Sequence, residues 1–312
     1  MADLMKWAKM EDIHDIAVCH ADDFTEVRQL LRQDVELGIL PPFTETDINK
    51  RVSPQMTLPQ AKSFIVILES YVPPVYKDDG RSGNISPAAS GTDYHQIVRN
   101  KLERLEDHIR KEMPDCHFIS FVDNSPFSEK HVAIRAGLGR LMQNGLFYSK
   151  KFGSRCYIGL ILTDHPPDEW HVPKRTDNTD DLFNRCASCG ACVRACPSQA
   201  LTPKGMNSYR CVSYLTQKKE DLDAFERKAL GKQVYGCDIC QRVCPLNTPV
   251  PKGYETGTPV DLEELLSLTN RQFNERYRQT AAGWRGKKIL QRNARIVQEN
   301  LGISNRETTT GE

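Results

Sequence analysis

Eight cysteines in the last part of the chain follow a spacing that few kinds of site use. The first run ends in Cys-Pro and consists of Cys186, Cys189, Cys192 and Cys196-Pro197. A single Cys211 comes next, and a second run follows with Cys237, Cys240 and Cys244-Pro245. Runs of this kind hold 4Fe–4S clusters in two-cluster bacterial ferredoxins, where the cysteine before the proline binds the other cluster. The spacing therefore predicts a chain that carries electrons through two such clusters.

The second run is one cysteine short, because Val234 stands where its first cysteine would be. Cys211 is the natural substitute, and with it the chain has eight ligands for two clusters. One cluster is predicted to use Cys186, Cys189, Cys192 and Cys244, and the other Cys196, Cys211, Cys237 and Cys240. A zinc site and a disulfide framework are the alternatives, although zinc has no use for a third cysteine at this spacing.

The rest of the composition limits the class of protein. The 312 residues suffice for about two domains. The net charge of +1 gives no overall reason to expect nucleic acid, so such a role must rest on a local patch. No apolar run is long enough to span a membrane, and the N-terminus lacks the apolar core of a secretion signal. We therefore expect a cytoplasmic protein with reduced thiols and no membrane contact, and we expect a monomer.

Hydrophobic periodicity predicts where helices and strands lie. Helical spacing covers residues 1–35, with an amphipathic helix opening at 22–31, and helices are also expected at 94–112 and from residue 261. Short apolar runs predict strands at 63–68, 117–122 and 157–163. A long loop is expected at 80–91, a linker at 164–185 and a frayed tail from Ser304.

Roughly 180 residues precede the cysteines, which is more than a simple electron carrier needs, so the clusters are expected to supply a separate reaction site. A flavin, a corrinoid or a partner protein could receive the electrons. Asp123 comes at the carboxyl end of a predicted strand, where site residues often stand, but it could also be a turn or helix-cap residue. Likewise, the two glycines of Arg135-Ala-Gly-Leu-Gly139 could admit a cofactor or end a helix.

A basic stretch near the C-terminus combines an aromatic residue with several cations. It runs from Trp284 to Arg295 and has no acidic residue. Cations of this kind suit a phosphate backbone, and Trp284 could stack on a base. A solvated helix face is the alternative.

Several of these motifs together resemble the epoxyqueuosine reductases, from about residue 10 to about residue 300. The shared motifs are Asp93-Tyr94-His95, Phe121-Val122-Asp123, Arg135 to Gly139, Gly153-Ser154, the cysteine layout, and Trp284 to Asn293. The resemblance implies an α+β fold with a nitroreductase-like α/β corrinoid-binding domain (1–175), a ferredoxin-like domain with two 4Fe–4S clusters (176–250) and a short helical, basic C-terminal segment (251–312) that packs back on the catalytic domain. Many family members continue into C-terminal helical repeats, and we expect a short form without them.

The resemblance also implies an activity. The clusters would pass electrons from an external low-potential donor to a base-off cobalamin, and epoxyqueuosine at the wobble position of tRNA would be reduced to queuosine. Asp123 matches the family's proton donor, which fits because an epoxide that opens develops charge on oxygen. A carboxyl group that donates a proton at neutral pH needs a raised pKa, which burial beside a corrin could provide.

Individual residues follow from the same resemblance. Corrinoid contacts are implied for Arg51, Ser86, Asp123, Phe147, Ile158, Ser213, Cys237, Asp238, Ile239 and Cys240. Contacts to tRNA are implied for Trp284, Arg285, Lys287, Lys288, Arg292 and Asn293. The segment Arg140 to Asn144 departs from the family pattern. Two other functions therefore stay open: a corrinoid and iron–sulfur reductase of a small halide or epoxide without tRNA, and a ferredoxin-like electron carrier.

Overall fold

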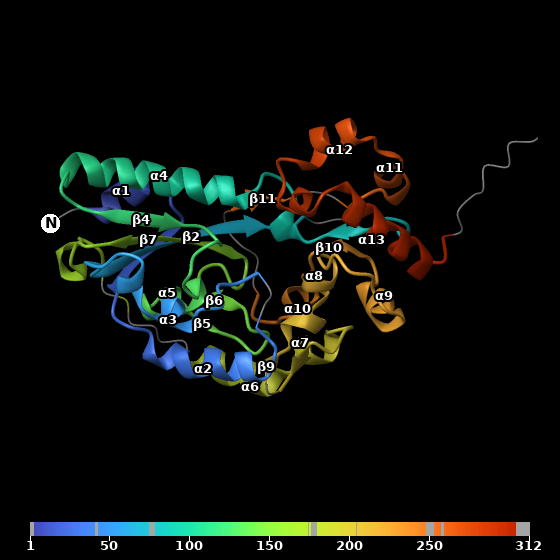
Figure 1. The fold of residues 1–312 in the computed structure, drawn as a ribbon, viewed down its shortest axis with the longest axis horizontal. Helices are drawn as coiled ribbons and strands as arrows, with labels where there is room; N and C mark the ends of the chain where they lie inside the picture. The colour runs from blue at the N-terminus through green and yellow to red at the C-terminus, as the bar shows by residue number, and fades with distance from the viewer. Residues whose placement is uncertain are drawn as a thin grey trace, which may run out of the picture.

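A mixed sheet forms the centre of the computed structural model, which describes residues 3–40, 43–74, 79–173, 175, 180–203, 205–247, 253–256 and 259–303. Its antiparallel strands lie in the order β1 (Asp15–His20), β2 (Ser63–Val72), β7 (Cys156–Thr163) and β4 (Phe118–Phe121) (Figure 1). The short strand β11 (Tyr254–Glu255) pairs with β2 in parallel. The C-terminal part of the chain therefore returns to the main sheet.

Strand β2 explains why helices cover both faces of this sheet. Its apolar side chains alternate between two cores, because successive residues of a strand point to opposite faces. Phe64 and Val66 belong to the core beneath α2 (Thr25–Glu36), α3 (Ile48–Val52) and α5 (Glu129–Arg135). Ile65 and Ile67 belong to the core beneath α1 (Leu4–Met10) and α4 (Tyr94–Glu112). Figure 1 shows these two groups of helices on opposite sides of the strands.

The cysteine-rich part is made of short elements. Its helices are α6 (Asp180–Cys189), α7 (Ala191–Ala195), α8 (Val212–Leu215), α9 (Ala224–Leu230) and α10 (Ile239–Arg242). Short strand pairs join β3 (Asn84–Ile85) to β10 (Gln233–Tyr235), β5 (Gly139–Leu141) to β6 (Phe147–Ser149), and β8 (Leu201–Thr202) to β9 (Gly205–Met206). Single 3-10 turns lie at Pro54–Met56, Pro87–Ala89, Pro167–Glu169, Ser208–Arg210 and Ala281–Arg285.

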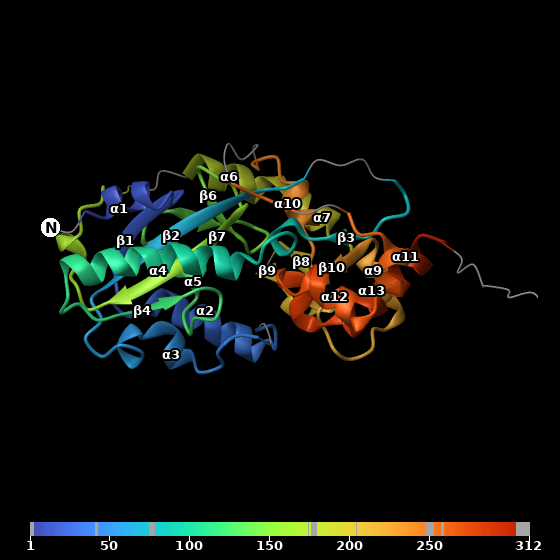
Figure 2. The ribbon, with the colours of Figure 1, turned by 90° about the horizontal axis from the view of Figure 1, so that it is seen from above.

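Three C-terminal helices complete the fold, namely α11 (Leu262–Ser267), α12 (Asn270–Tyr277) and α13 (Lys287–Asn300). They lie at the end of the molecule opposite α1 (Figure 2). Their core includes Leu290, Ala294 and Val297 of α13 together with Val234 and Tyr235 of β10. This core joins the C-terminal helices to the cysteine-rich part. The predicted division of the chain into three domains stays a prediction.

The predicted elements agree with the structure except near the N-terminus. The helix at 94–112 is confirmed as α4, and the three predicted strands are confirmed as β2, β4 and β7. The helical prediction for residues 1–35 is wrong at β1, an edge strand whose alternation is short. The linker at 164–185 contains the start of α6, and its residues 174 and 176–179, like the tail from Ser304, lie outside the described residues. Within the described part of the chain, no helix has the length and apolar character that a membrane span requires.

Candidate functional site

One group of cysteines surrounds a single surface cavity. Cys186, Cys189, Cys192 and Cys244 all line it. The chain can bend between the second and third of these because Gly190, between α6 and α7, has a positive φ of 63°. The backbone N–H of Gln143 donates to the sulfur of Cys186 at 3.3 Å, which is the kind of contact that stabilises a thiolate.

The other four cysteines of the pattern form a second group. Burial raises the pKa of Cys211, and it raises the pKa of Cys237 and of Cys240 to about 12. Neighbouring thiols add to each shift: Cys211 is affected by Cys196, Cys237 by Cys211 and Cys240, and Cys240 by Cys211, by Cys192 of the first group and by Cys196. Thiols that are this difficult to ionise become thiolates when a metal supplies the positive charge.

The eight thiols suit two clusters because they form two groups of four. Over the described ranges, no three His, Cys, Asp or Glu side chains are close enough to share one ion. A zinc site needs four ligands around one ion, whereas the thiolates of a 4Fe–4S cluster each bind a different iron. The two spatial groups agree with the predicted pairing of ligands, and the assignment of each ligand stays a prediction.

A carboxylate and a histidine form the candidate proton-transfer site. Asp123 follows β4 with a positive φ of 61°, and its side chain is 59% exposed. His95 lies between two carboxylates, with Nε2 3.3 Å from Oδ2 of Asp123 and Nδ1 2.7 Å from Oδ1 of Asp93. Because ionised carboxylates only accept hydrogen bonds, both ring nitrogens must donate. This arrangement favours the imidazolium form of His95.

The titration of this pair follows from the same contacts. Burial works against a charged His95, but its hydrogen bonds with Asp123 and Asp93 raise its pKa. The hydrogen bond from His95, helped by one from Tyr94, outweighs burial and lowers the pKa of Asp123. In the protein alone the pKa of Asp123 is therefore lowered, because two donors stabilise the carboxylate. The raised pKa expected beside a bound corrin stays a prediction.

A second carboxyl group nearby was missed by the sequence interpretation. Glu129 begins α5, and burial, followed by the charge of Asp123, raises its pKa to about 8. Its Oε1 atom is buried and has no hydrogen-bond partner among the described residues. The raised pKa favours the neutral form of this carboxyl group. The only signal for it in the sequence is its position at a helix start.

A stack of aromatic rings connects this site with the second cysteine group. Tyr94 stacks on His95 and on Tyr157, with ring centroids 4.0 and 4.5 Å apart, and Tyr157 stacks on Tyr71 at 5.0 Å. The Tyr71 hydroxyl donates to Gln241 at 3.1 Å, and Gln241 directly follows Cys240. The stack leaves His95 little freedom to rotate and so maintains its bonds with the carboxylates.

Most of the predicted corrinoid contacts converge near Gly236. The amide of Ser86 donates to the carbonyl of Tyr235 at 2.8 Å, and a Cβ atom on Gly236 would stand 2.6 Å from that of Ser86. The amide of Gly236 donates to Thr216, whose hydroxyl donates to the carbonyl of Ser213. The segment Cys237 to Cys240, including Asp238 and Ile239, follows directly. Separately, Phe147 and Ile158 pack in the core below the sheet.

Arg51 is the strongest sign of a missing polar partner. Its side chain is buried, at 8% exposure for the residue, and its Nε and Nη1 atoms have no hydrogen-bond partner among the described residues. Burial lowers the pKa of this guanidinium, although Asp34 and Glu45 oppose the shift. A buried guanidinium with unused donors is costly unless a ligand accepts from it. Arg51 therefore fits a cofactor that offers oxygen atoms.

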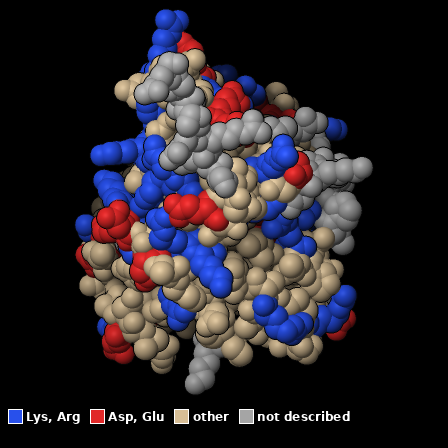
Figure 3. Space-filling view, turned by 90° about the vertical axis from the view of Figure 1, so that its right-hand side faces the viewer, with Lys and Arg blue, Asp and Glu red and all other residues tan. Residues whose placement is uncertain are grey.

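An exposed aromatic and cationic surface contains three of the predicted tRNA residues. Trp284 is 57% exposed, and the guanidinium of Arg285 lies 3.8 Å from the centre of its ring. The same guanidinium lies 4.5 Å from the ring of Phe43, which is 52% exposed and which the sequence interpretation missed. Lys288 is exposed on the next helix. Figure 3 shows Lys and Arg clustered at this end of the molecule, with some Asp and Glu between them.

The structure corrects the expectation for Asn293. This residue is 0% exposed, and its amide nitrogen donates to the carbonyls of Thr216 and Val234, so it holds α13 against β10 and cannot reach RNA. The guanidinium of Arg292 donates to the carbonyls of Lys218 and Glu220. Lys287 donates to a carbonyl at the end of α11, at 3.2 Å. These hydrogen bonds attach Arg292 and Lys287 to neighbouring backbone carbonyls, so both side chains stabilise the fold in addition to any contact with RNA.

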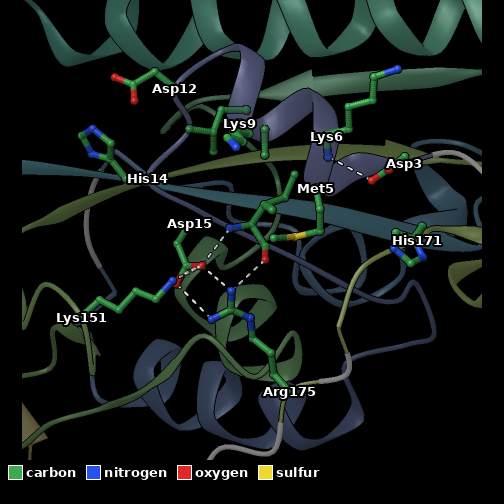
Figure 4. Close-up of a pocket in the computed structure, with 13 residues that line it drawn as sticks. Asp3, Met5, Lys6, Lys9, Asp12, His14, Asp15, Lys151, His171 and Arg175 are labelled. Atoms are coloured by element: carbon green, nitrogen blue, oxygen red, sulfur yellow. Dashed lines mark hydrogen bonds and ion pairs between the residues drawn. The ribbon is translucent and has the colours of Figure 1, made fainter.

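A separate cavity of about 700 Å³ lies beside α1 (Figure 4). Its charges are largely paired, because the buried Asp15 accepts from Lys151 at 2.9 Å and from Arg175 at 3.0 Å. The described residues that line it include none of the predicted cluster, corrinoid or tRNA residues. This cavity is therefore distinct from the candidate site.

Two family models match the parts of the chain that carry these groups. The model described as "4Fe-4S double cluster binding domain" matches residues 185–247, so a domain for two such clusters is present. The model described as "Epoxyqueuosine reductase QueG, DUF1730" matches residues 51–124, which include Arg51, His95 and Asp123.

Characterised relatives resemble the chain over nearly its whole length. The epoxyqueuosine reductase of Bacillus subtilis is 37% identical over 308 residues, which cover 94% of this chain and 77% of that protein. The solved epoxyqueuosine reductase of Streptococcus thermophilus superimposes with a TM-score of 0.85 at 36% identity, covering 95% of this chain and 80% of the other. A structure of an epoxyqueuosine reductase with an epoxyqueuosine-modified tRNA-Tyr stem loop gives 0.84 at 34% identity, covering 96% and 80%. By its sequence and its fold, the chain belongs to the epoxyqueuosine reductase family of oxidoreductases.

Proposed function

We propose that this protein reduces epoxyqueuosine to queuosine at the wobble position of tRNA. The observation that carries the proposal is the match to the solved relative with a modified stem loop, which extends over 96% of this chain. The Asp123 and His95 pair and the two cysteine groups supply the chemistry that the reaction needs. A ferredoxin-like carrier or a reductase of small electrophiles would not need an exposed Trp284 and Phe43 beside a basic helix.

Electrons would pass from the first cysteine group to the second and from there to the cofactor. Cys186, Cys189, Cys192 and Cys244 would hold the cluster nearer the surface, and Cys196, Cys211, Cys237 and Cys240 would hold the inner one. An external low-potential donor would reduce the first of these. Bound base-off cobalamin would supply two-electron reduction at cobalt. Arg51, Ser86, Phe147, Ile158, Ser213 and the segment 237–240 would hold it.

Protons complete the balance of the reaction. Conversion of the epoxide to an alkene takes two electrons and two protons and releases the oxygen as water. The imidazolium of His95 holds one proton 3.3 Å from Asp123, which can pass it to an oxygen in the site. Glu129, whose pKa is raised to about 8, can hold a second.

The direct test uses anaerobically reconstituted protein with cobalamin, a chemical reductant and tRNA that carries epoxyqueuosine. Nucleosides from digested tRNA are separated and identified by mass. We expect queuosine to accumulate with time. Protein with full iron and cobalamin content that leaves epoxyqueuosine unchanged would overturn the proposed substrate, and conversion of a small epoxide under the same conditions would favour the alternative reductase.

The unused donors of Arg51 predict that replacing this residue stabilises the cofactor-free protein but weakens cobalamin binding. Arg51→Met removes a buried group whose unsatisfied donors cost about 1–3 kcal/mol, so we expect cofactor-free protein to unfold at a higher temperature. The same change removes hydrogen bonds to cobalamin, and we expect its dissociation constant to rise about tenfold. Thermal unfolding and absorbance titration measure the two effects. Arg32→Met, on the exposed surface of α2, should change neither, and stronger cobalamin binding by Arg51→Met would contradict the role.

The exposed indole gives a prediction about RNA. Trp284→Ala removes a stacking surface worth about 1–3 kcal/mol per base, so we expect KM for tRNA to rise about tenfold or more with little change in kcat. Trp284→Phe should keep most of the affinity, because it keeps an aromatic face. An equal loss in both variants would point to packing rather than stacking.

The pH dependence of kcat/KM follows from the Asp123 and His95 pair. Asp123 is ionised above its lowered pKa, and His95 is protonated below its raised pKa, so the proton-loaded pair exists between these two values. We expect kcat/KM to fall as pH rises through the pKa of His95, above its usual value. In His95→Gln this alkaline fall should change its midpoint. A profile identical to that of the unaltered protein would show that another group controls it.

A further inference from the structure

We propose that the surface around the first cysteine group, formed by α6, α7 and α10, is the docking site for a small acidic electron-carrier protein. This inference rests on the proposed function, which requires an external donor and does not say where it binds. The surface consists of Phe183, Arg185, Arg194, Arg242 and Val243, and we call it the donor face.

The position of the donor face suits electron entry. The cavity lined by Cys186, Cys189, Cys192 and Cys244 is also lined by the exposed Arg185. Arg194 reaches back over the turn between α6 and α7, since a Cβ atom on Gly190 would stand 2.9 Å from its Nη1 atom. A carrier that touches these cations would bring its redox centre next to the predicted outer cluster.

The charge of the donor face is unusual for this chain. The whole sequence is nearly balanced, with 42 Lys and Arg against 41 Asp and Glu. Yet no Asp or Glu occurs from Leu182 to Lys219, or from Ile239 to Tyr254. Arg185 and Arg194 are exposed in the first segment, which follows the exposed Asp181, and Arg242 in the second lies 3.6 Å from Asp238. Cations therefore outnumber carboxylates on this region, which presents positive charge to solvent. Such a field attracts an acidic partner and speeds its association.

Apolar side chains add the second element of an interface. Phe183 on α6 is 46% exposed, and Val243, directly after α10, is 40% exposed. Large apolar groups beside cations are typical of the centre and rim of a transient protein interface.

The donor face does not overlap the aromatic and cationic surface around Trp284, Arg285 and Phe43, which we call the RNA surface. Trp284 lies just before α13, whereas the donor face lies on α6, α7 and α10. Helices α6 and α13 lie apart in both ribbon views (Figures 1 and 2). A carrier and a tRNA could therefore bind at the same time, which matters because each carrier delivers one electron. Two carriers, each oxidised by one electron, and two protons balance the reduction of one epoxide.

The test uses reduced flavodoxin, a small acidic carrier, and the cluster-loaded protein. Cluster reduction is followed by stopped-flow absorbance at increasing salt. We expect Arg194→Glu and Phe183→Glu to lower the second-order rate about tenfold, and the rate for the unaltered protein to fall with salt. The matched control is Arg104→Glu on α4, whose side chain is 61% exposed; it makes the same change in net charge and should alter the rate less than about twofold.

Two further measurements keep the outcomes distinct. With dithionite in place of flavodoxin, both variants should form queuosine at the normal rate, which also shows that they fold and hold iron. Arg194→Gln provides a milder change if the reversal does not fold. Equal rates with flavodoxin in Arg194→Glu and Arg104→Glu would overturn the proposal, and so would a loss of tRNA binding by Arg194→Glu, which would make the face an RNA surface. Loss of dithionite activity in the unaltered protein would instead reject the proposed function.

Discussion

Asp123→Asn is expected to lower kcat for queuosine formation by about 10²–10⁴-fold, with tRNA affinity nearly unchanged. Asparagine keeps the size of the side chain but can neither release nor relay a proton. It also stabilises the imidazolium of His95 less, because one of the two carboxylate acceptors, 3.3 Å away, is gone and only Asp93 remains. The rate of a single turnover, measured with saturating tRNA and preloaded cobalamin, isolates this step from electron supply.

A matched control exists at the opposite end of β4. Asp164 accepts from Nδ1 of His117 at 2.8 Å, in another pair of aspartate and histidine at the end of a strand. Asp164→Asn changes charge and hydrogen bonding in the same way but should leave turnover intact. If Asp123→Asn retains the full rate, Glu129 or water supplies the proton and the assignment of Asp123 fails.

Cys211→Ser is expected to abolish turnover and to halve the iron content, from about eight to about four per chain. Cys211 stands alone in the sequence, yet its thiol interacts with Cys196 and lies in the second cysteine group. The first group keeps all its thiols in this variant, so its cluster should persist and still accept electrons. Electrons would then stop before the reaction site.

Iron analysis and electron paramagnetic resonance of the reduced protein measure this prediction. Cys116→Ser is the control, because this free thiol contacts Thr163 and belongs to neither group. Its iron content should equal that of the unaltered protein. A Cys211→Ser protein with full iron would show that another residue is the missing ligand.

The sequence revealed the elements whose signals are local. Helix α4 was predicted at its true bounds because Asp93 caps it and its apolar residues recur with helical spacing. The presence of a domain for two clusters was predictable because the spacing of cysteines within each short run is typical of such domains, whereas the assignment of each ligand stays a prediction. Strand β1 was missed because six residues at a sheet edge give too little alternation to outweigh the helical pattern around them.

The features that escaped prediction depend on distant parts of the chain. Phe43 reaches the RNA surface from the loop after α2, and nothing in its neighbours signals a contact with Arg285. The lowered pKa of Asp123 arises from His95, 28 residues away. The resemblance implies an RNA contact for Asn293, but its position on α13 turns it to the core, where it bonds the carbonyls of Thr216 and Val234. In each case the sequence shows the residue type, but it does not show which distant residues surround it in the fold.

The most direct measurement of the central claim is the nucleoside content of tRNA after one defined reduction. Protein with about eight irons and one cobalamin per chain is mixed with epoxyqueuosine tRNA and a limiting supply of electrons. We expect one queuosine for every two electrons consumed. Electrons that disappear without queuosine, or queuosine that forms equally well without cobalamin, would contradict it.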